Sequence, residues 1–189
     1  KCAGLNWGLE QCHESNFRIH AVIGYEKQAS YYVRDILGAY LWGCPTVFVG
    51  GESDVGNHYN LSQWGNDAFC GRWPFVYPKP SYVAVATATK MLDRVTGLRK
   101  IPTGDDCVYA VEFPRADGKA VTAFWTSRGE ILATVKGEGE ARWSFSDMYG
   151  REMKRSSRLT ISERVAYLLA NPGAVASVEI LSRDFPEDR

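Results

Sequence analysis

The chain has 189 residues, with 22 Lys and Arg against 22 Asp and Glu, so its formal net charge is zero. This balance gives no electrostatic reason to expect a nucleic-acid or membrane partner, and no apolar run approaches the ~18 residues that a membrane-spanning helix needs. Aromatic residues make up 13% of the chain, which suits a packed core or flat platforms on which sugar rings or bases stack.

The first half of the chain, residues 1–97, alternates strand-like and helix-like stretches. Residues 6–12 are a strand candidate that leads into a polar cluster. Residues 26–41 carry apolar side chains at three- and four-residue spacing, which predicts a helix with one buried face. Gly43 and Pro45 follow this stretch, and residues of these types end helices.

A second strand and helix follow in the same order. Residues 46–49 are a short apolar run of the buried-strand kind, and residues 52–79 form a long loop rich in Gly, Asn and aromatic residues. A loop of this length inside a compact domain is usually functional. Pro80 suits the first turn of a helix, and residues 81–95 carry a second apolar helical stripe. The alternation predicts βα repeats on a parallel sheet.

Residues 98–181 change to short strand-like runs separated by Gly-containing turns, which predicts a small antiparallel β-sandwich. Trp125 and Trp143 are expected in its core. The charged residues 182–189 are expected to form a flexible tail. The predicted strands are residues 107–113, 120–126, 131–135, 142–145, 159–161, 165–169 and 176–180.

The cysteines show no metal or redox pattern. They stand at positions 2, 12, 44, 70 and 107 without C-x-x-C spacing, and the His residues do not complete a zinc pattern with them. We therefore expect no metal site and no cofactor. Two interpretations stay open: a disulfide between Cys44 and Cys70 that closes a loop in an oxidising compartment, or buried cysteines in the reduced form.

One short segment resembles a different class of protein. Residues 19–25, Ile-His-Ala-Val-Ile-Gly-Tyr, resemble the histidine strand of papain-like cysteine proteases, and residues 61–65 loosely resemble their Asn-Ser-Trp-Gly segment. That fold needs a nucleophilic Cys well upstream of the His. Cys12 lies only eight residues before His20. This spacing argues against a cysteine protease.

A more extensive resemblance covers nearly the whole chain. Residues 11–17, 28–37 and 78–87 carry, in this order, short patterns that resemble the end of the seventh strand, the seventh helix and the start of the last helix of a (β/α)8 barrel. The barrels concerned are glycoside hydrolases of the large retaining clan that includes cellulases and β-xylosidases. Residues 147–152, Asp-Met-Tyr-Gly-Arg-Glu, resemble the Asp-x-x-Gly-Arg turn of the small sandwich that follows such barrels.

The resemblance implies a chain that is α/β plus all-β. Residues 1–97 would form the last βα units of a (β/α)8 barrel, and residues 98–181 would form a small antiparallel β-sandwich. In such a chain the rest of the barrel precedes this sequence. The upstream barrel portion of the same parent chain is therefore an expected partner.

The resemblance also assigns a catalytic carboxylate. Retaining glycosidases use one carboxylate as nucleophile and a second as acid and base, and barrel enzymes carry such residues at the C-terminal ends of strands. Glu14 follows a strand candidate and is the implied nucleophile. Glu10 competes with it, because two-residue alternation places both on one face of a strand. His13, where the family usually has Thr or Ser, and Asn16 are the implied substrate-binding neighbours.

In such a barrel, the loop after the eighth strand lines the substrate cleft. Here this loop holds Glu52, His58, Trp64 and Trp73. Its polar side chains are candidates to bind sugar hydroxyls. The two Trp side chains either stack on a pyranose face or pack the loop against the barrel.

These assignments imply the C-terminal part of a glycoside hydrolase that cleaves a poly- or oligosaccharide and is inactive without its upstream part, which would carry the acid/base glutamate. The expected substrate is a carbohydrate, and we expect such an enzyme to be secreted. An alternative from another class stays open, namely a noncatalytic carbohydrate-binding or scaffold module. A fourth barrel strand that ends in Asn-Glu would support the hydrolase over the binding module.

Overall fold

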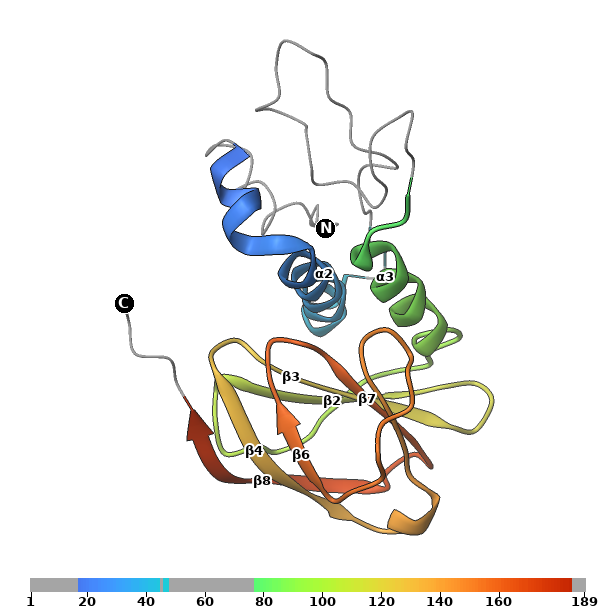
Figure 1. The fold of residues 1–189 in the computed structure, drawn as a ribbon. Coiled ribbons are helices and arrows are strands. Elements are labelled where there is room, and N and C mark those ends of the chain that lie inside the picture. Colours follow the sequence, from blue (N-terminus) through green and yellow to red (C-terminus); the bar gives the residue numbers. More distant parts are fainter. Residues whose placement is uncertain (1–16, 45, 48–76, 185–189) are drawn as a thin grey trace. The chain divides into compact units, whose positions relative to one another are not determined.

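The computed structural model describes residues 17–44, 46–47 and 77–184, with side chains from residue 24 onward. The chain divides into two compact units, Lys1–Ala86 and Thr87–Arg189. Figure 1 shows two described helices followed along the chain by the strands of the second unit. Within the described residues, no helix combines the length and the apolar character that crossing a membrane requires. The expected division at residue 97 stays a prediction.

The first described helix is α2, Phe17–Leu41. It contains the predicted helix at residues 26–41 and continues upstream across Gly24, whose backbone is not helical (φ 72°, ψ 161°). Glycine suits this kink because other residues rarely adopt a positive φ. Residues 19–25 therefore lie in a kinked helix and not in a strand. The helix agrees with the spacing argument against a cysteine protease.

One face of α2 is buried, as its apolar spacing predicts. The buried side chains on this face include Ala29, Tyr32, Val33, Ile36 and Leu37. Their three- and four-residue spacing places them on one side of the helix. The hydrophobic period of the sequence thus identified the buried side of α2 correctly.

The second described helix, α3 (Pro80–Met91), begins at the predicted proline. It ends before the predicted residue 95. Arg94 adopts a left-handed backbone conformation (φ 51°), and Val95 forms a bridge with Arg115. The chain therefore leaves the helix to pair with a distant segment.

Part of the predicted barrel lies outside the described residues. This holds for the strand at residues 6–12 and for most of the loop at 52–79. Of the predicted strand at residues 46–49, only Thr46 and Val47 are described, and they belong to no regular element. The parallel sheet expected in the first half therefore stays a prediction.

The strands of the second unit form two antiparallel sheets, which together we call the two-sheet region (Figure 1). The five-stranded sheet has the order β1-β2-β3-β7-β5, and the three-stranded sheet has the order β6-β4-β8. Each strand predicted within residues 98–181 overlaps an observed one. The elements are β1 Arg99–Lys100, β2 Val108–Pro114, β3 Ala120–Thr126, β4 Glu130–Gly137, the 3-10 helix η1 Glu140–Arg142, β5 Ser144–Ser146, β6 Arg158–Ile161, β7 Ala166–Ala170 and β8 Val175–Asp184.

Both sheets contribute to one hydrophobic core. Phe124 and Leu168 enter it from the five-stranded sheet, and Ile131 and Ile161 enter it from the three-stranded sheet. β3 is buried along its whole length, in keeping with its place between β2 and β7. The sequence of β3 is apolar apart from Thr122 and Thr126, which are also buried.

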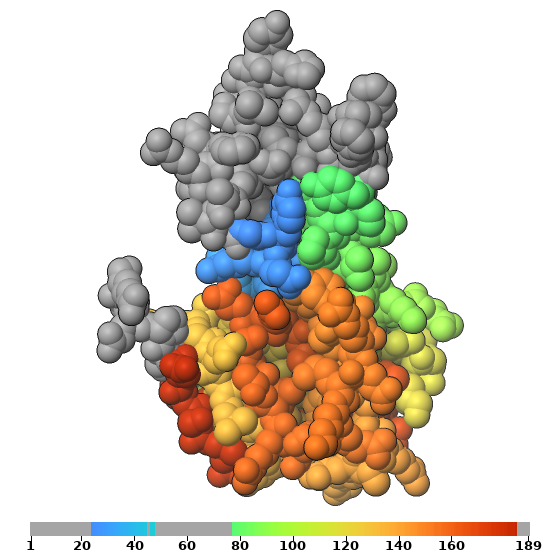
Figure 2. Space-filling model, viewed as in Figure 1, coloured from blue at the N-terminus to red at the C-terminus, as the bar shows by residue number. Residues whose placement is uncertain are grey.

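Both Trp residues that the sequence assigns to the core are buried. Trp143 belongs to the shared core and packs edge-on against Phe145, with ring centroids 6.2 Å apart. Trp125 stacks on Tyr109 of the neighbouring strand, with ring centroids 4.9 Å apart. Figure 2 shows the segment that follows β4, coloured orange, over the side of the two-sheet region turned to the viewer. Core packing therefore accounts for Trp125 and Trp143 among the aromatic residues of the chain.

A buried carboxylate links β2 with the start of β8. Glu112 is 2% exposed and accepts two hydrogen bonds from the Arg99 guanidinium, at 3.2 and 3.0 Å. The backbone N–H of Gly173 also donates to this carboxylate, at 3.2 and 3.1 Å to its two oxygens. Arg99 donates in addition to the carbonyl oxygen of Val175, at 2.8 Å. The charge of Glu112 is thus paired and hydrogen-bonded, which is the condition for burying a carboxylate at low cost.

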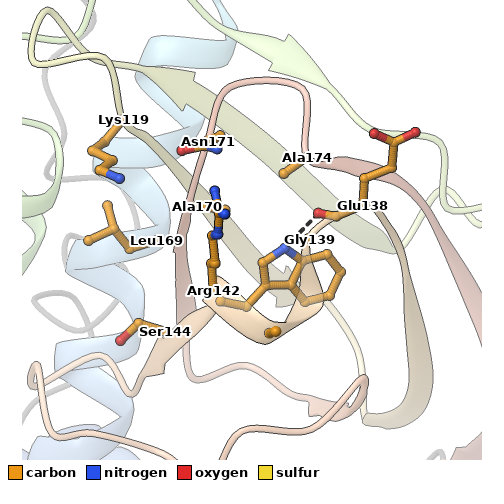
Figure 3. A pocket seen from close by; sticks show the side chains of 11 residues that line it. Lys119, Glu138, Gly139, Arg142, Ser144, Leu169, Ala170, Asn171 and Ala174 are labelled. Carbon is orange, nitrogen blue, oxygen red and sulfur yellow. Dashed lines mark hydrogen bonds between the residues drawn. The ribbon is translucent and has the colours of Figure 1, made fainter.

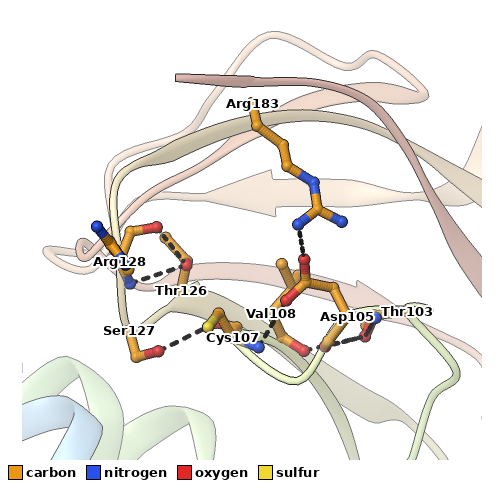
Figure 4. A network of polar contacts seen from close by, with 8 residues as sticks. All are labelled: Thr103, Asp105, Cys107, Val108, Thr126, Ser127, Arg128 and Arg183. Atoms are coloured by element: carbon orange, nitrogen blue, oxygen red, sulfur yellow. Dashed lines mark hydrogen bonds and ion pairs between the residues drawn. The ribbon is translucent and has the colours of Figure 1, made fainter. Parts of the chain in front are cut away.

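A polar contact holds the end of β8 (Figure 4). The Asp105 carboxylate accepts the backbone N–H of Cys107 at 2.6 Å and forms an ion pair with Arg183. Residues 182–184, predicted as part of a charged tail, instead continue β8 and pair with residues 130–132 of β4. The assignment of residues 182–184 to the tail is corrected here, because these residues pair with β4 and Arg183 forms an ion pair with Asp105. Residues 185–189 lie outside the described residues.

Gly137→Ala is expected to destabilise the two-sheet region. A Cβ at this position would lie 1.9 Å from the backbone carbonyl oxygen of Ala174. Overpacking of this kind costs about 1–3 kcal/mol, which denaturant unfolding would measure as a lower midpoint. Gly97→Ala is the matched control, because no atom lies within 4 Å of a Cβ there. Equal stability of the two variants would contradict the close approach of β4 and Ala174.

Candidate functional site

The site residues predicted from the sequence lie outside the described residues. They are Glu14 with its competitor Glu10, together with His13, Asn16, Glu52, His58, Trp64 and Trp73. Cys70 also lies outside, so its pairing with the buried Cys44 stays a prediction. The structure does describe the helices that follow these site residues in the sequence. α2 begins directly after Asn16, and α3 begins at Pro80, directly after the predicted loop.

An aromatic cluster with a buried cation lies within the first unit. Tyr25 follows the kink of α2 at Gly24, and Tyr77 and Lys79 precede α3. The Lys79 Nζ atom lies 5.2 Å from the centroid of the Tyr25 ring, and the hydroxyl oxygens of Tyr25 and Tyr77 lie 3.4 Å apart. Lys79 is 1% exposed, whereas Tyr25 and Tyr77 are 43% and 47% exposed. The cluster therefore presents two phenol groups to solvent above a buried ammonium group.

The Tyr25–Lys79 contact is a cation–π interaction, in which the negative face of the ring attracts the ammonium group. It offers a polar ligand two hydroxyls and a fixed positive charge nearby. Lys79 lies within the Lys-Pro pattern that resembles the start of the last barrel helix, but that pattern assigns it no role. Its burial is a property of the folded chain and has no signal in the local sequence.

Asp35 of α2 is a second group that sequence analysis missed. Burial raises the pKa of the Asp35 carboxyl from 3.8 to about 6, and the charge of Arg34 opposes this shift to a smaller extent. Its Oδ2 atom is buried and has no hydrogen-bond partner among the described residues. A carboxyl with this pKa can take up and release a proton near neutral pH.

The described residues contain no complete catalytic or metal site. Within residues 24–44, 46–47 and 77–184, no group of three or more His, Cys, Asp or Glu side chains is arranged to hold a metal ion. Glycoside hydrolysis needs two carboxyl groups across the scissile bond. Asp35 and the Tyr25–Lys79 cluster are therefore candidate accessory groups. The predicted nucleophile, Glu14, precedes both of them in the sequence.

Comparison with known proteins gives one informative result. No protein-family model matches the chain, and no curated protein is significantly similar to it in sequence. Among solved structures, the chain is similar to one described as "Structural insights into a family 39 glycoside hydrolase from the gut symbiont Bacteroides cellulosilyticus WH2", with a TM-score of 0.63 and 18% sequence identity.

The chain has a glycoside hydrolase-like fold. The similarity covers 77% of this chain and 30% of the glycoside hydrolase chain, so the sequence spans less than a third of that neighbour. The helices and the two antiparallel sheets described above are compatible with this fold. The expectation of a glycoside hydrolase-like chain is thus confirmed at the level of the fold.

Asp35→Asn is expected to change how stability depends on pH. Because the folded-state pKa of Asp35 is raised from 3.8 to about 6, the folded chain binds the proton more tightly than the unfolded chain. The free energy of unfolding should therefore fall as the pH rises from about 4 to about 6 and remain lower above that range. The Asn variant should lose this fall and be more stable than the parent at pH 7 in thermal unfolding.

The matched control for this measurement is Asp106→Asn, which removes an exposed carboxylate of the second unit. The control should keep the parent's fall in stability between about pH 4 and pH 6. An Asp35→Asn variant with the same pH dependence as the parent would contradict the raised pKa.

Proposed function

We propose that this chain is the C-terminal part of a retaining glycoside hydrolase, with Glu14 as the nucleophile. The observation that carries the proposal is the similarity of its fold to a family 39 glycoside hydrolase. The chain spans 30% of that neighbour, so the proposed active site includes residues of an upstream barrel portion. That portion supplies the acid/base glutamate.

The positions of the helices support the proposed place of Glu14. Residues 28–37 lie inside α2, and α3 begins at Pro80 within the segment 78–87, so helices occur where the resemblance to barrel enzymes expects them. Glu14 precedes Phe17, the first residue of α2, by three positions. A residue between a barrel strand and the helix after it lies at the catalytic end of the barrel.

The proposed chemistry takes two steps. The Glu14 carboxylate attacks the anomeric carbon while the acid/base residue protonates the leaving oxygen, and a glycosyl–enzyme ester forms. The acid/base residue, now a carboxylate, then takes a proton from water, and this water attacks the same carbon and releases Glu14. Each step moves charge between two carboxyl groups, so Glu14 must be ionised when the substrate binds.

The remaining predicted residues complete the proposed substrate site. His13, Asn16, Glu52 and His58 would bind sugar hydroxyls. Trp64 and Trp73 would stack on pyranose faces, whose C–H groups suit an aromatic surface. The proposed substrate is a poly- or oligosaccharide, and secretion of the parent protein is part of the proposal, because polysaccharides of this kind lie outside the cell.

Glu14→Gln is expected to abolish turnover in the full-length protein that contains this chain. The amide is a poor nucleophile, so kcat on an aryl glycoside should fall roughly 10⁴-fold or more. In the parent, a mechanism-based fluoro-sugar should label Glu14, and mass spectrometry of the digested protein would locate the label. The Glu14→Gln variant should lose both turnover and the label, because it cannot form the covalent intermediate.

Glu10→Gln is the matched control and should keep both activity and labelling. A label on Glu10 would move the nucleophile to that residue and leave the class of enzyme unchanged. Unchanged activity of Glu14→Gln, with no label on either residue, would reject the catalytic assignment. A full-length protein that binds polysaccharide without hydrolysing it would favour the noncatalytic binding module instead.

A further inference from the structure

The two-sheet region contains a pocket of about 320 Å³ at one end of the five-stranded sheet (Figure 3). This volume lies at the lower end of the ~300–1,000 Å³ range of small-molecule sites. The exposed residues Lys119, Arg142 and Asn171 line it together with the more buried Trp143 and Leu169. All of these residues belong to the second unit, and the proposed catalytic residues take no part in it.

Strand pairing brings the polar side chains of the pocket together from distant parts of the sequence. Ala120 of β3 pairs with Ala170 of β7, so the next position along the two strands sets Lys119 opposite Asn171. On the other side of β7, Ser144 of β5 pairs with Leu169, and Arg142 ends the 3-10 helix η1 two residues before Ser144. Residues opposite each other on neighbouring strands point to the same face. The side chains of Lys119, Asn171 and Arg142 therefore meet at one pocket (Figure 3).

Both cationic side chains lack a counter-ion within the described part of the chain. Asp117, the acidic residue nearest to Lys119 in sequence, is held by Arg115 at 2.7 Å, and its other oxygen accepts the backbone N–H of Lys119 at 3.1 Å. No ion pair of the Lys119 ammonium or the Arg142 guanidinium occurs among the described residues. Two positive charges near each other repel, so an anion between them is favoured.

Glu138 also lines the pocket but does not neutralise it. Its backbone carbonyl oxygen accepts the indole N–H of Trp143 at 3.2 Å. Figure 3 shows its carboxylate directed away from Arg142 and Lys119. The indole nitrogen of Trp143 is therefore occupied and adds no hydrogen-bond donor to the pocket.

The pocket thus combines an apolar wall with a cationic and hydrogen-bonding rim. Leu169 is partly buried and forms the wall with the neighbouring alanines, and Trp143, which is 2% exposed, belongs to the core beneath it. A guanidinium holds a carboxylate through two parallel hydrogen bonds. An amide such as that of Asn171 both donates to and accepts from hydroxyl groups. This set of groups suits a ring with an apolar face, hydroxyls and one carboxylate.

We propose that this pocket binds an acidic monosaccharide unit, with its carboxylate between Lys119 and Arg142 and a ring hydroxyl on Asn171. The pocket has more room than a bare inorganic anion needs. The site is noncatalytic and independent of the proposed hydrolysis at Glu14. Its ligand would be a uronic acid at the end or along the length of a polysaccharide.

Titration calorimetry of the whole chain with glucuronate, glucose and acetate at low salt tests the proposal. Glucuronate should bind at least about 10-fold more tightly than glucose or acetate, because only glucuronate carries both the charge and the ring. Arg142→Ala and Lys119→Ala should each weaken glucuronate binding about 10-fold. Lys154→Ala is the matched control, since it removes the charge of an exposed lysine that does not line the pocket. Circular dichroism would verify that all variants fold.

Several results would overturn the proposal. Equal affinity for glucuronate and glucose would show that the two cations do not select the ligand. Equal affinity for acetate would reduce the pocket to a carboxylate site without a sugar. Undetectable glucuronate binding, or equal affinity of Arg142→Ala and Lys154→Ala, would reject the pocket as the site. None of these results tests the catalytic role of Glu14, which the covalent labelling experiment tests separately.

Discussion

The two-sheet region depends on one shared hydrophobic core. A strand presents alternate side chains to each face, and the inward residues of both sheets meet in a single cluster that includes Phe124, Leu168 and Ile131. Removing their apolar surface from water is the main favourable term in folding. A slip of one residue would turn these side chains outward. The core therefore determines the register in which β2, β3 and β7 pair.

That register also positions groups outside the core. It aligns the ends of β3, β7 and β5, so Lys119, Asn171 and Arg142 line one pocket although they come from distant parts of the sequence. The buried carboxylate of Glu112 adds a second constraint, because it binds the backbone N–H of Gly173 in the turn that follows Asn171. The end of the sheet that carries the pocket is thus held by apolar packing and by one buried ion pair.

The two proposals use different parts of the chain. Hydrolysis is assigned to Glu14, just before α2, and recognition of an acidic sugar is assigned to the two-sheet region. A noncatalytic site on the same chain raises the effective concentration of a polysaccharide near the catalytic residues when both can be engaged at once. With this arrangement, a pocket of low affinity would still contribute to the binding of a long polysaccharide substrate.

The sequence by itself determined the elements whose pattern is local. The helix at residues 26–41 follows from apolar spacing, and β3 follows from an apolar run between turns. The proposed nucleophile, Glu14, came from resemblance, which needs only order along the chain. Tertiary structure alone decided the burial of Lys79, the raised pKa of Asp35 and the continuation of β8 through Arg183. Each of these depends on groups that folding brings together from distant positions, and local periodicity carries no information about such neighbours.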